Sequence, residues 1–404
     1  MQGETILCVA TDDWDSLWRP IQQTMSRFAP ENRVIYFEPG RNPERSVASE
    51  FFDNLPNYWK LRARIVQENL FVIPTPSNLP TARRFLPRSL LKLTMPMVNK
   101  FNNRILIKQI RKTMGALEIQ SPLLWLFDPS QVGLIDKFGE KLSCYYNYDD
   151  FPNFTQNSRI QRYLRNQDEE LCRQVDVVIA TSHSQWEIRK DLNPRTYCVP
   201  NGVDFDLFNK AINPETPTPS DISGLKKPVI GYVGWLGYQM DLDLLLGIAS
   251  MYTDCSIALI GPDAIPKNAK YRLLQKMPNV HFLGQKTLHS LPEYLKVIDV
   301  ALIPYLLEGY VLTAYPLKLH EYLAAGRAIV ATALPELRPY KNVVRIAETH
   351  ADFIAKIREA MLDYDRLTIA ARVAVAKANT WDSRIVDIYN IIQPLIMESR
   401  NPRL

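Results

Sequence analysis

The chain has 404 residues, longer than one typical domain, and we expect two or three domains. Hydrophobic residues make up 46% and charged residues 23%, which excludes a disordered protein, and no apolar run reaches the roughly 18 residues that a membrane-spanning helix needs. The net charge is +5, and the excess of basic residues is concentrated in one segment.

The N-terminal segment, MQGETILCVATDD, has no basic region leading into an apolar stretch. It therefore predicts a first buried strand at residues 5–10 rather than a signal peptide. The five cysteines are scattered and include no Cys-x-x-Cys pair, so neither a disulfide framework nor a zinc site is indicated. Free thiols are typical of a reducing cytosol, and we expect a cytoplasmic protein.

Residues 81–117 hold nine basic side chains and no acidic one, interleaved with apolar residues. This combination suits a surface that faces anionic lipid headgroups, as in a peripheral membrane protein. A solvated basic face on helices whose apolar side is core fits it equally well, and both interpretations stay open. Nucleic acid is disfavoured because aromatic residues for base stacking are nearly absent. The basic residues are Arg83, Arg84, Arg88, Lys92, Lys100, Arg104, Lys108, Arg111 and Lys112.

Short apolar runs alternate with helix-compatible sequence along the whole chain, which predicts an α/β fold with parallel sheets. Two such halves predict two facing Rossmann-like domains, with ligands bound in a cleft at the carboxyl ends of the strands. The candidate strands are TILCVA, RVIYFE, LFVIP, PLLWLF, LSCYYN, DVVIA and TYCVP in the first half, and PVIGYVG, CSIALIG, VHFLG, DVALIPY, RAIVAT and NVVRIA in the second.

Residues 213–228, NPETPTPSDISGLKKP, hold four prolines and precede a strand, so they predict a connector near a domain boundary. We place the N-terminal domain at residues 1–204 and the C-terminal domain at residues 205–381. The remaining residues, 382–404, predict a last helix that follows all the strands. Two arrangements stay open for this helix: packing on the C-terminal domain, or packing back on the N-terminal domain.

The segment YPLKLHEYLAAGRAIVAT, residues 315–332, contains the most informative charges. Pro316 suits the first position of a helix and Gly326 the position just after its end, which predicts a helix at residues 316–325. Lys318 and Glu321 lie on one face of that helix. They suit a phosphate at the helix start and the hydroxyls of a ribose behind it. An ordinary surface ion pair is the alternative, and spacing alone favours it.

The same segment resembles the donor-binding segment of the GT-B-fold glycosyltransferases of family 4, the glycosyl transferases group 1. Its PLKLHEYLAAGRAIVAT is similar to the variant "P-K-EYLA-G-PVVAT" of that family. The resemblance extends over most of the chain, in the family's order. It includes WDSLWRPIQQTMSRFAPENRVIYFEP near the N-terminus, VDVVIATSHS, VPNGVDFDLF, VIGYVGWLG and NVHFLGQKTLHSLPEYLKVIDVALIPY.

The resemblance implies two facing domains and transfer of a sugar, as by a hexosyltransferase, from a nucleotide sugar to an acceptor hydroxyl with retention of configuration. Glu321 would bind the ribose, and backbone N–H groups at residues 316–318 the pyrophosphate. Stabilising the departing charge is then the main catalytic task. It implies a product in polysaccharide or glycolipid synthesis and no required metal or other cofactor. The implied donor-binding residues are Gly234, Trp235, Gly237, Thr313, Pro316, Leu317, Lys318 and Glu321.

The sequence departs from the family at three places. Trp235 and Met240 stand where many members have an arginine and a lysine that neutralise the leaving pyrophosphate. Thr313 stands where the first of two paired glutamates falls, and Glu308 lies thirteen residues before Glu321. Lys318 is therefore the candidate that replaces the missing cations.

The third departure is the segment CYYNYDDF, where the family has a histidine near the sugar. Asn147, Asp149 and Asp150 stand there instead, and both aspartates are candidate catalytic residues beside Lys318 and Glu321. The candidate acceptor-binding residues follow the first strand and are Asp12, Asp13, Trp14 and Arg19. Plain turn chemistry explains the two aspartates equally well.

Two weaker motifs are set aside. Asp241 and Asp243 form a DxD, the metal-binding signature of another glycosyltransferase fold, but here they open a helix, where acidic residues favour the dipole. The segment GYVGWLG has the spacing G-x-x-G-x-x-G, which does not match a dinucleotide fingerprint. The alternatives to a transferase are a nucleotide-sugar epimerase or hydrolase of the same fold and a non-catalytic relative that binds a nucleotide or glycan.

Overall fold

The computed structural model describes residues 1–39, 63–75, 88–155, 157–363 and 365–400, with the side chains of residues 88–94, 399 and 400 excepted. The chain divides into two compact units, one formed by residues 1–200 with 385–404 and the other by residues 201–384. Both units alternate strands and helices, which confirms the predicted α/β class.

The first unit is built on a sheet of eight strands in the order β3-β4-β2-β1-β5-β6-β7-β8. Neighbouring strands are parallel except for β3 and β4, which are antiparallel. The sequence did not reveal β3, a short edge strand whose side chains are all at least partly exposed. The strands are β1 (Thr5–Val9), β2 (Arg33–Glu38), β3 (Arg64–Gln67), β4 (Leu70–Pro74), β5 (Leu123–Leu126), β6 (Leu142–Asn147), β7 (Val177–Ala180) and β8 (Thr196–Cys198).

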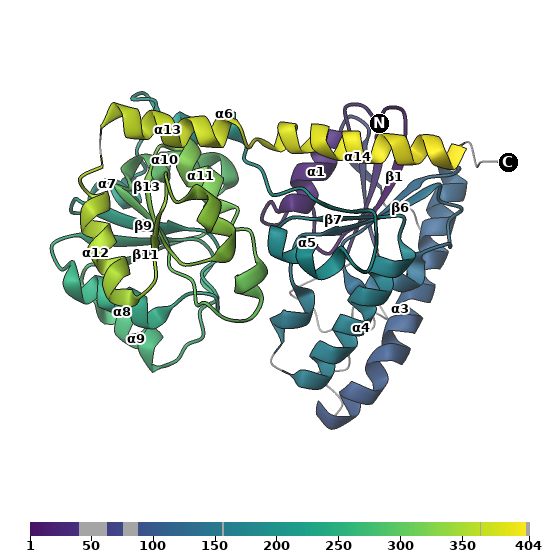
Figure 1. The fold of residues 1–404 in the computed structure, drawn as a ribbon, viewed down its shortest axis with the longest axis horizontal. Helices are drawn as coiled ribbons and strands as arrows, with labels where there is room; N and C mark the ends of the chain where they lie inside the picture. Colours follow the sequence, from purple (N-terminus) through teal and green to yellow (C-terminus); the bar gives the residue numbers. More distant parts are fainter. Residues whose placement is uncertain (40–62, 76–87, 156, 364, 401–404) are drawn as a thin grey trace. The chain divides into compact units, whose positions relative to one another are not determined.

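Helices cover both faces of this sheet (Figure 1). Side chains of β1 alternate between the faces, with Ile6 in one buried cluster and Leu7 in the other. The first face is covered by α1 (Pro20–Phe28) and by α14 (Trp381–Arg400), and the second by α3 (Arg88–Ala116) and α4 (Ser158–Gln174). The described residues of this unit also form α5 (His183–Arg189).

The second unit has a fully parallel sheet of six strands in the order β11-β10-β9-β12-β13-β14. The chain runs outward from β9 through β10 to β11 and then returns to β12 on the other side of β9. The strand order therefore reverses between β9 and β12, which is where ligands bind in open parallel sheets. The strands are β9 (Val229–Val233), β10 (Ser256–Ile260), β11 (Val280–Gly284), β12 (Val300–Ile303), β13 (Ala328–Thr332) and β14 (Arg345–Ala347).

Two groups of helices enclose the second sheet (Figure 1). On one face lie α8 (Leu242–Met251), α9 (Ala269–Lys276) and α12 (His350–Ala360), and on the other lie α6 (Phe205–Phe208), α10 (Leu291–Val297), α11 (Lys318–Ala324) and α13 (Arg366–Lys377). The proline-rich residues 213–228 are not the link between the units, because they lie inside the second unit and contain the short helix α7 (Ser220–Ser223).

Helix α14 belongs to both units. Its first residue, Trp381, is 2% exposed, and the Trp381 N–H donates to the Val203 carbonyl at 3.0 Å in the second unit. From residue 385 onward the helix belongs to the first unit. There Tyr389 stacks on Phe28 with ring centroids 5.5 Å apart. The predicted limits, after residues 204 and 381, lie near the observed ones.

The buried face of α14 should therefore matter to the stability of the first unit. Ile392 is fully buried and Val386, on the same helix, is 56% exposed. Ile392→Ala should lower the free energy of unfolding by about 2–4 kcal/mol, because it leaves a cavity, whereas Val386→Ala should cost less than about 0.5 kcal/mol. Urea titration measures both, and hydrogen exchange of the β1 amides locates the loss. Equal effects of the two substitutions would contradict this packing.

Candidate functional site

The candidate site of the second unit lies where β9 and β12 end. Gly234 follows β9 directly and has a φ of +142°, which a residue with a side chain rarely adopts. Tyr305 follows β12 after one proline, and Lys318 is the first residue of α11. Three segments that are far apart in the sequence thus meet at the point where the strand order reverses.

Lys318 is buried at this point, with 9% of its surface exposed. Its ammonium donates a hydrogen bond to the Tyr305 hydroxyl. It also lies 5.0 Å from the ring centroids of both Tyr232 and Tyr305. A side chain at Gly234 would begin 3.3 Å from Lys318 Nζ, so the ammonium reaches the glycine turn.

Helix α11 is shorter than predicted. It begins at Lys318 and ends at Ala324, whereas the sequence predicted residues 316–325. Pro316 and Leu317 precede it, and the Leu319 N–H donates to the Pro316 carbonyl at 3.1 Å. A proline near the start is compatible with several exact boundaries, which explains the difference. Gly326 follows the helix with a φ of +68°, as predicted.

Glu321 lies on the same helix as Lys318, yet the two side chains form no ion pair among the described residues. The surface-pair alternative is therefore wrong for this structure. Glu321 is partly exposed, and none of the hydrogen bonds of the described residues involves its carboxylate. Burial raises the pKa of Glu321 to about 7, although the nearby Lys318 ammonium opposes this. A carboxylate in this setting can accept bonds from a ligand.

Trp235 and Gly237, two further residues predicted to bind the sugar donor, contact each other and their neighbours in the same turn. The Trp235 carbonyl accepts bonds from Tyr232 and Gln239 at 2.9 and 2.6 Å, and the Trp235 ring packs against Tyr238. A side chain at Gly237 would run into the Trp235 ring, at 2.6 Å. The absence of a side chain at Gly237 therefore makes room for the Trp235 ring. The sequence had suggested a different reason for this glycine, the approach of its backbone to a donor.

Met240, Thr313 and Glu308, which bear on the departures from the family, have different surroundings. Met240 is 2% exposed and belongs to the core, so it does not face a ligand. The Thr313 hydroxyl donates to the Tyr310 carbonyl at 3.1 Å. Glu308 is exposed and precedes the 3₁₀ helix η6 (Gly309–Thr313), which also contains Thr313.

Sequence reasoning missed the tyrosines that build this site. The Tyr322 hydroxyl, one turn after Lys318, accepts from the Val233 N–H at 2.8 Å and donates to the Val233 carbonyl at 3.2 Å. It thereby ties α11 to the end of β9. Tyr232 and Tyr305 surround the ammonium. For Tyr232 and Tyr305, the available signal was a position near the carboxyl end of a predicted strand.

A second cluster lies at the carboxyl edge of the first sheet. Asp12 follows β1 and accepts a bond from Thr11 Oγ1 at 2.9 Å. Arg19 Nη1 lies 3.6 Å from Asp12 Oδ1, and the Tyr148 hydroxyl lies 2.9 Å from Thr11 Oγ1. Burial raises the pKa of Asp149 to about 7, while the neighbouring Arg19 guanidinium opposes this. The structure thus brings Asp12, Arg19 and Asp149 together.

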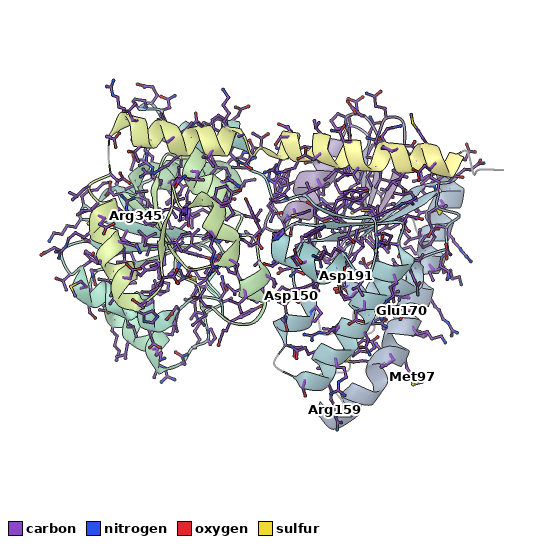
Figure 2. All side chains as sticks on the ribbon, in the orientation of Figure 1. Met97, Asp150, Arg159, Glu170, Asp191 and Arg345 are labelled. Atoms are coloured by element: carbon purple, nitrogen blue, oxygen red, sulfur yellow. The ribbon has the colours of Figure 1, made fainter. Side chains whose placement is uncertain are left out.

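Three further candidates near this cluster have local partners. Asp150 is 5% exposed and its carboxylate accepts from the Asn153 side chain at 2.7 Å, beside the 3₁₀ helix η3 (Phe151–Phe154); the residue is labelled in Figure 2. The Asp13 carbonyl accepts from the Gln22 amide at 3.1 Å. Trp14 is 7% exposed and packs against Trp18 and Tyr36.

Asp241 and Asp243 have the helical role expected of them. Asp241 is the N-cap of α8, where its carboxylate accepts from the Leu244 N–H at 3.0 Å and lies 2.7 Å from His350 Nε2. Asp243 pairs with Lys270 at 2.5 Å. Because their oxygens have these partners, the DxD is a helix start.

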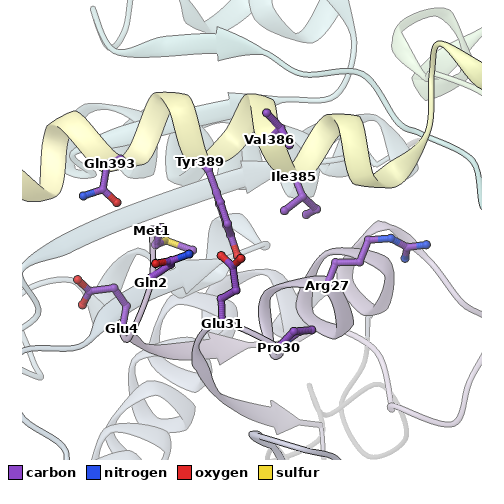
Figure 3. Close-up of a pocket in the computed structure, with 10 residues that line it drawn as sticks. All are labelled: Met1, Gln2, Glu4, Arg27, Pro30, Glu31, Ile385, Val386, Tyr389 and Gln393. Carbon is purple, nitrogen blue, oxygen red and sulfur yellow. The ribbon is translucent and has the colours of Figure 1, made fainter.

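The first unit also contains a cavity of about 600 Å³ (Figure 3). Met1 and Glu4, which precede β1, and Glu31, which precedes β2, line it together with Tyr389 and Gln393 of α14. The cavity therefore lies at the amino ends of the strands, opposite the edge that holds Asp12. Ligands of parallel sheets bind at the carboxyl ends, so this cavity is not part of the candidate site.

Solved structures share this architecture. Sucrose-phosphate synthase from Thermosynechococcus elongatus superposes with a TM-score of 0.70 at 14% identity, over 98% of this chain and 100% of that one. Trehalose-6-phosphate synthase from E. coli, in a structure with UDP-2-fluoro glucose, gives 0.68 at 12% identity over 97% and 99%. HepE of Anabaena, in a structure with UDP, gives 0.62 at 14% identity over 97% and 100%. The chain therefore has the GT-B fold.

Part of the second unit is similar in sequence to a known protein family. Residues 227–363 match the family described as "Glycosyl transferases group 1". The putative teichuronic acid biosynthesis glycosyltransferase TuaH of Bacillus subtilis is 26% identical over 231 residues, which are 55% of this chain and 58% of TuaH. The match thus spans less than two thirds of that relative. The matched residues of the second unit are thus similar to the glycosyl transferases of group 1, which is the family that the sequence resembles.

The raised pKa of Glu321 predicts how stability depends on pH. Its ordinary value is 4.5 and its folded value about 7, so the folded state holds an extra proton between these limits and loses stability as the pH rises through them. Glu321→Gln removes this loss. It should match the wild type at pH 4 and exceed it by roughly 1–3 kcal/mol at pH 8 in denaturant titrations. The exposed Glu348→Gln is the control, and no gain for Glu321→Gln at pH 8 would disprove the buried setting.

Proposed function

We propose that the protein is a glycosyltransferase of hexosyltransferase type, which moves a sugar from a nucleotide-diphosphate sugar to an acceptor hydroxyl. The observation that supports this best is the pair at the carboxyl edge of the second sheet. Glu321 is a partly exposed residue whose carboxylate has no hydrogen-bond partner among the described residues, and Lys318 has a buried ammonium beside the Gly234 turn. The two lie in the segment that matches the family.

Each of the two groups suits one part of the donor. The Glu321 carboxylate can accept the two hydroxyls of a ribose. The Lys318 ammonium suits the negative charge that grows on the pyrophosphate as the bond to the sugar breaks, and such stabilisation is the main catalytic contribution available here. UDP-glucose is the donor to test first, and UDP the nucleotide to test for binding, because structures of the same fold have been solved with UDP and with a UDP sugar. We propose retention of configuration and no requirement for a metal.

The acceptor side is proposed to be the cluster of the first unit. Asp12 and Asp149 offer carboxylate oxygens to sugar hydroxyls, and Arg19, which is close to both, offers hydrogen-bond donors. The proposed acceptor is a glycan or a lipid-linked sugar, and the named role of TuaH in teichuronic acid biosynthesis supports a polysaccharide product. Asp13 and Trp14 have structural contacts and are proposed to support the loop that presents Asp12.

Substitution of Glu321 tests the transferase. Glu321→Ala should lower donor hydrolysis and sugar transfer by at least about a hundredfold, because the ribose loses a charge-assisted anchor in the transition state. A panel of nucleotide sugars is assayed by release of the nucleotide diphosphate, with and without EDTA. Glu348→Ala, at an exposed glutamate of the same unit, should retain full activity.

The possible results separate the alternatives. Unchanged turnover in Glu321→Ala would remove this residue from the site, and loss of activity in EDTA would overturn metal independence. Nucleotide-dependent thermal stabilisation without any turnover would favour a non-catalytic binding protein. Release of nucleotide diphosphate without an acceptor product, under any acceptor supplied, would favour a hydrolase.

We also propose that helix α3 meets an anionic membrane surface. None of the described helices is both long and apolar enough to cross a bilayer. On the described part of α3, exposed basic residues accompany two exposed apolar ones, Met97 at 74% and Phe101 at 46% (Met97 is labelled in Figure 2). This mixture suits lipid headgroups. The exposed basic residues are Lys100, Arg104, Lys108, Arg111 and Lys112. Arg83 and Arg84 lie outside the described residues, as do the side chains of Arg88 and Lys92.

Vesicle binding tests the membrane surface. The double variant Lys100→Glu/Arg104→Glu should bind vesicles of phosphatidylglycerol and phosphatidylcholine at least about tenfold more weakly, since each basic residue near such a surface contributes roughly 1 kcal/mol. Binding of the wild type should also weaken with salt. Lys276→Glu/Lys341→Glu, at exposed lysines of the second unit, is the control. Binding that changes with neither salt nor the α3 charges would refute the proposal.

A further inference from the structure

We infer that Tyr305 and Tyr232 are positioning residues, which hold the Lys318 ammonium at the Gly234 turn so that its charge faces a phosphate of the donor. The inference rests on the proposed function and adds a device that none of the sequence motifs indicates. It also explains how one lysine can do the work of two cationic residues, whose positions in the family are occupied here by Trp235 and Met240.

The Lys318 ammonium is buried without an ion pair to any described residue. Transfer of an ammonium from water into a protein interior is costly, and such groups usually pair with a carboxylate. Lys318 is 9% exposed, and none of the ion pairs of the described residues includes it. Its partners are one hydroxyl and the faces of two aromatic rings, each 5.0 Å from Nζ. The ring faces attract a cation but leave its charge uncompensated.

Both rings are fixed in place. The Tyr232 hydroxyl donates to the Trp235 carbonyl at 2.9 Å and lies 3.3 Å from the Tyr305 hydroxyl. The Gln239 amide donates to the same carbonyl at 2.6 Å. The backbone beside Tyr305 is also held, because the Leu306 N–H donates to the Gln239 carbonyl at 2.9 Å. The ammonium thus lies between rings anchored to the ends of β9 and β12.

The direction of the hydrogen bonds supports the same role. One assignment of the hydroxyl protons satisfies all three bonds: Lys318 donates to Tyr305, Tyr305 to Tyr232, and Tyr232 to the Trp235 carbonyl. Bonds in such a chain polarise one another. An ammonium has three N–H donors, and the bonds of the described residues use one of them. The other two remain for an anion beside the Gly234 turn, where a side chain on residue 234 would begin only 3.3 Å from Nζ.

This arrangement suits a leaving pyrophosphate. A carboxylate in a direct ion pair with Lys318 would already neutralise the ammonium and compete with the phosphate. Two tyrosines orient it without neutralising it, so that its full charge acts where the negative charge develops. Since hydrogen bonds hold the hydroxyl of Tyr232 and the backbone beside Tyr305, we expect little reorganisation when the donor reacts.

The experiment compares binding of UDP and of uridine, by calorimetry, to the full chain and its variants. Lys318→Met should weaken UDP at least about tenfold and leave uridine within about twofold, because only the phosphates lose their partner. Without ligand this variant should melt at a higher temperature than the wild type, since a buried charge without an anion is removed. A purely structural lysine would give the opposite: a lower melting temperature and an unchanged preference for UDP.

The tyrosines are tested by kinetics with the donor that the wild type accepts. Tyr305→Phe keeps the ring and removes the hydroxyl, so kcat should fall at least about tenfold while the donor KM changes less than about threefold. Tyr294→Phe is the matched control, because Lys286 lies 5.0 Å from that ring, in the same unit but away from the site. Unchanged kcat in Tyr305→Phe would overturn the positioning role.

Failure of the inference differs from failure of the proposed function. If neither UDP nor any nucleotide sugar binds the wild type, the proposed function fails, and this inference with it. If UDP binds and Glu321→Ala weakens it, but Lys318→Met keeps the wild-type ratio of UDP to uridine affinity, only the inference fails.

Discussion

The hydroxyl of Tyr322 holds the candidate site together. It accepts from the N–H and donates to the carbonyl of Val233, the last residue of β9, and so fixes α11 against the end of that strand. Lys318 lies one turn before Tyr322 on the same helix, and Glu321 immediately precedes it. The positions of the Lys318 ammonium and of the Glu321 carboxylate therefore both depend on this contact between helix and strand.

The carboxyl edges of the two sheets hold side chains of opposite charge. In the second sheet the strand order reverses beside β9, and the Lys318 ammonium lies there without an ion pair to any described residue. In the first sheet the corresponding edge holds carboxylates, and burial raises the pKa of Asp149 to about 7. The amino-terminal edge of the first sheet holds a cavity but belongs to neither arrangement. In both units the polar groups that suit a ligand stand where the backbone of parallel strands ends.

The fold was largely predictable because buried parallel strands leave a strong signal. All thirteen candidate strands are present, since continuous apolar runs separated by helical sequence have few other interpretations. The missing strand, β3, pairs antiparallel at the sheet edge and has no buried residue, so no apolar run marks it. The start of α11 was placed two residues early, because Pro316 suits several positions near a helix start.

The sequence alone determined the two α/β units, the importance of residues 315–332 and the presence of Lys318 and Glu321 in them. Those features are local, and spacing and residue type encode them. Only the tertiary structure decided whether the two charges pair. It buries Lys318 beside the rings of Tyr232 in β9 and Tyr305 just after β12, and it puts Asp150 beside Asn153. Within the described ranges it gives the Glu321 carboxylate no partner. Spacing along one helix cannot reveal this, because the partners come from strands that are up to 86 residues away, as from Tyr232 to Lys318.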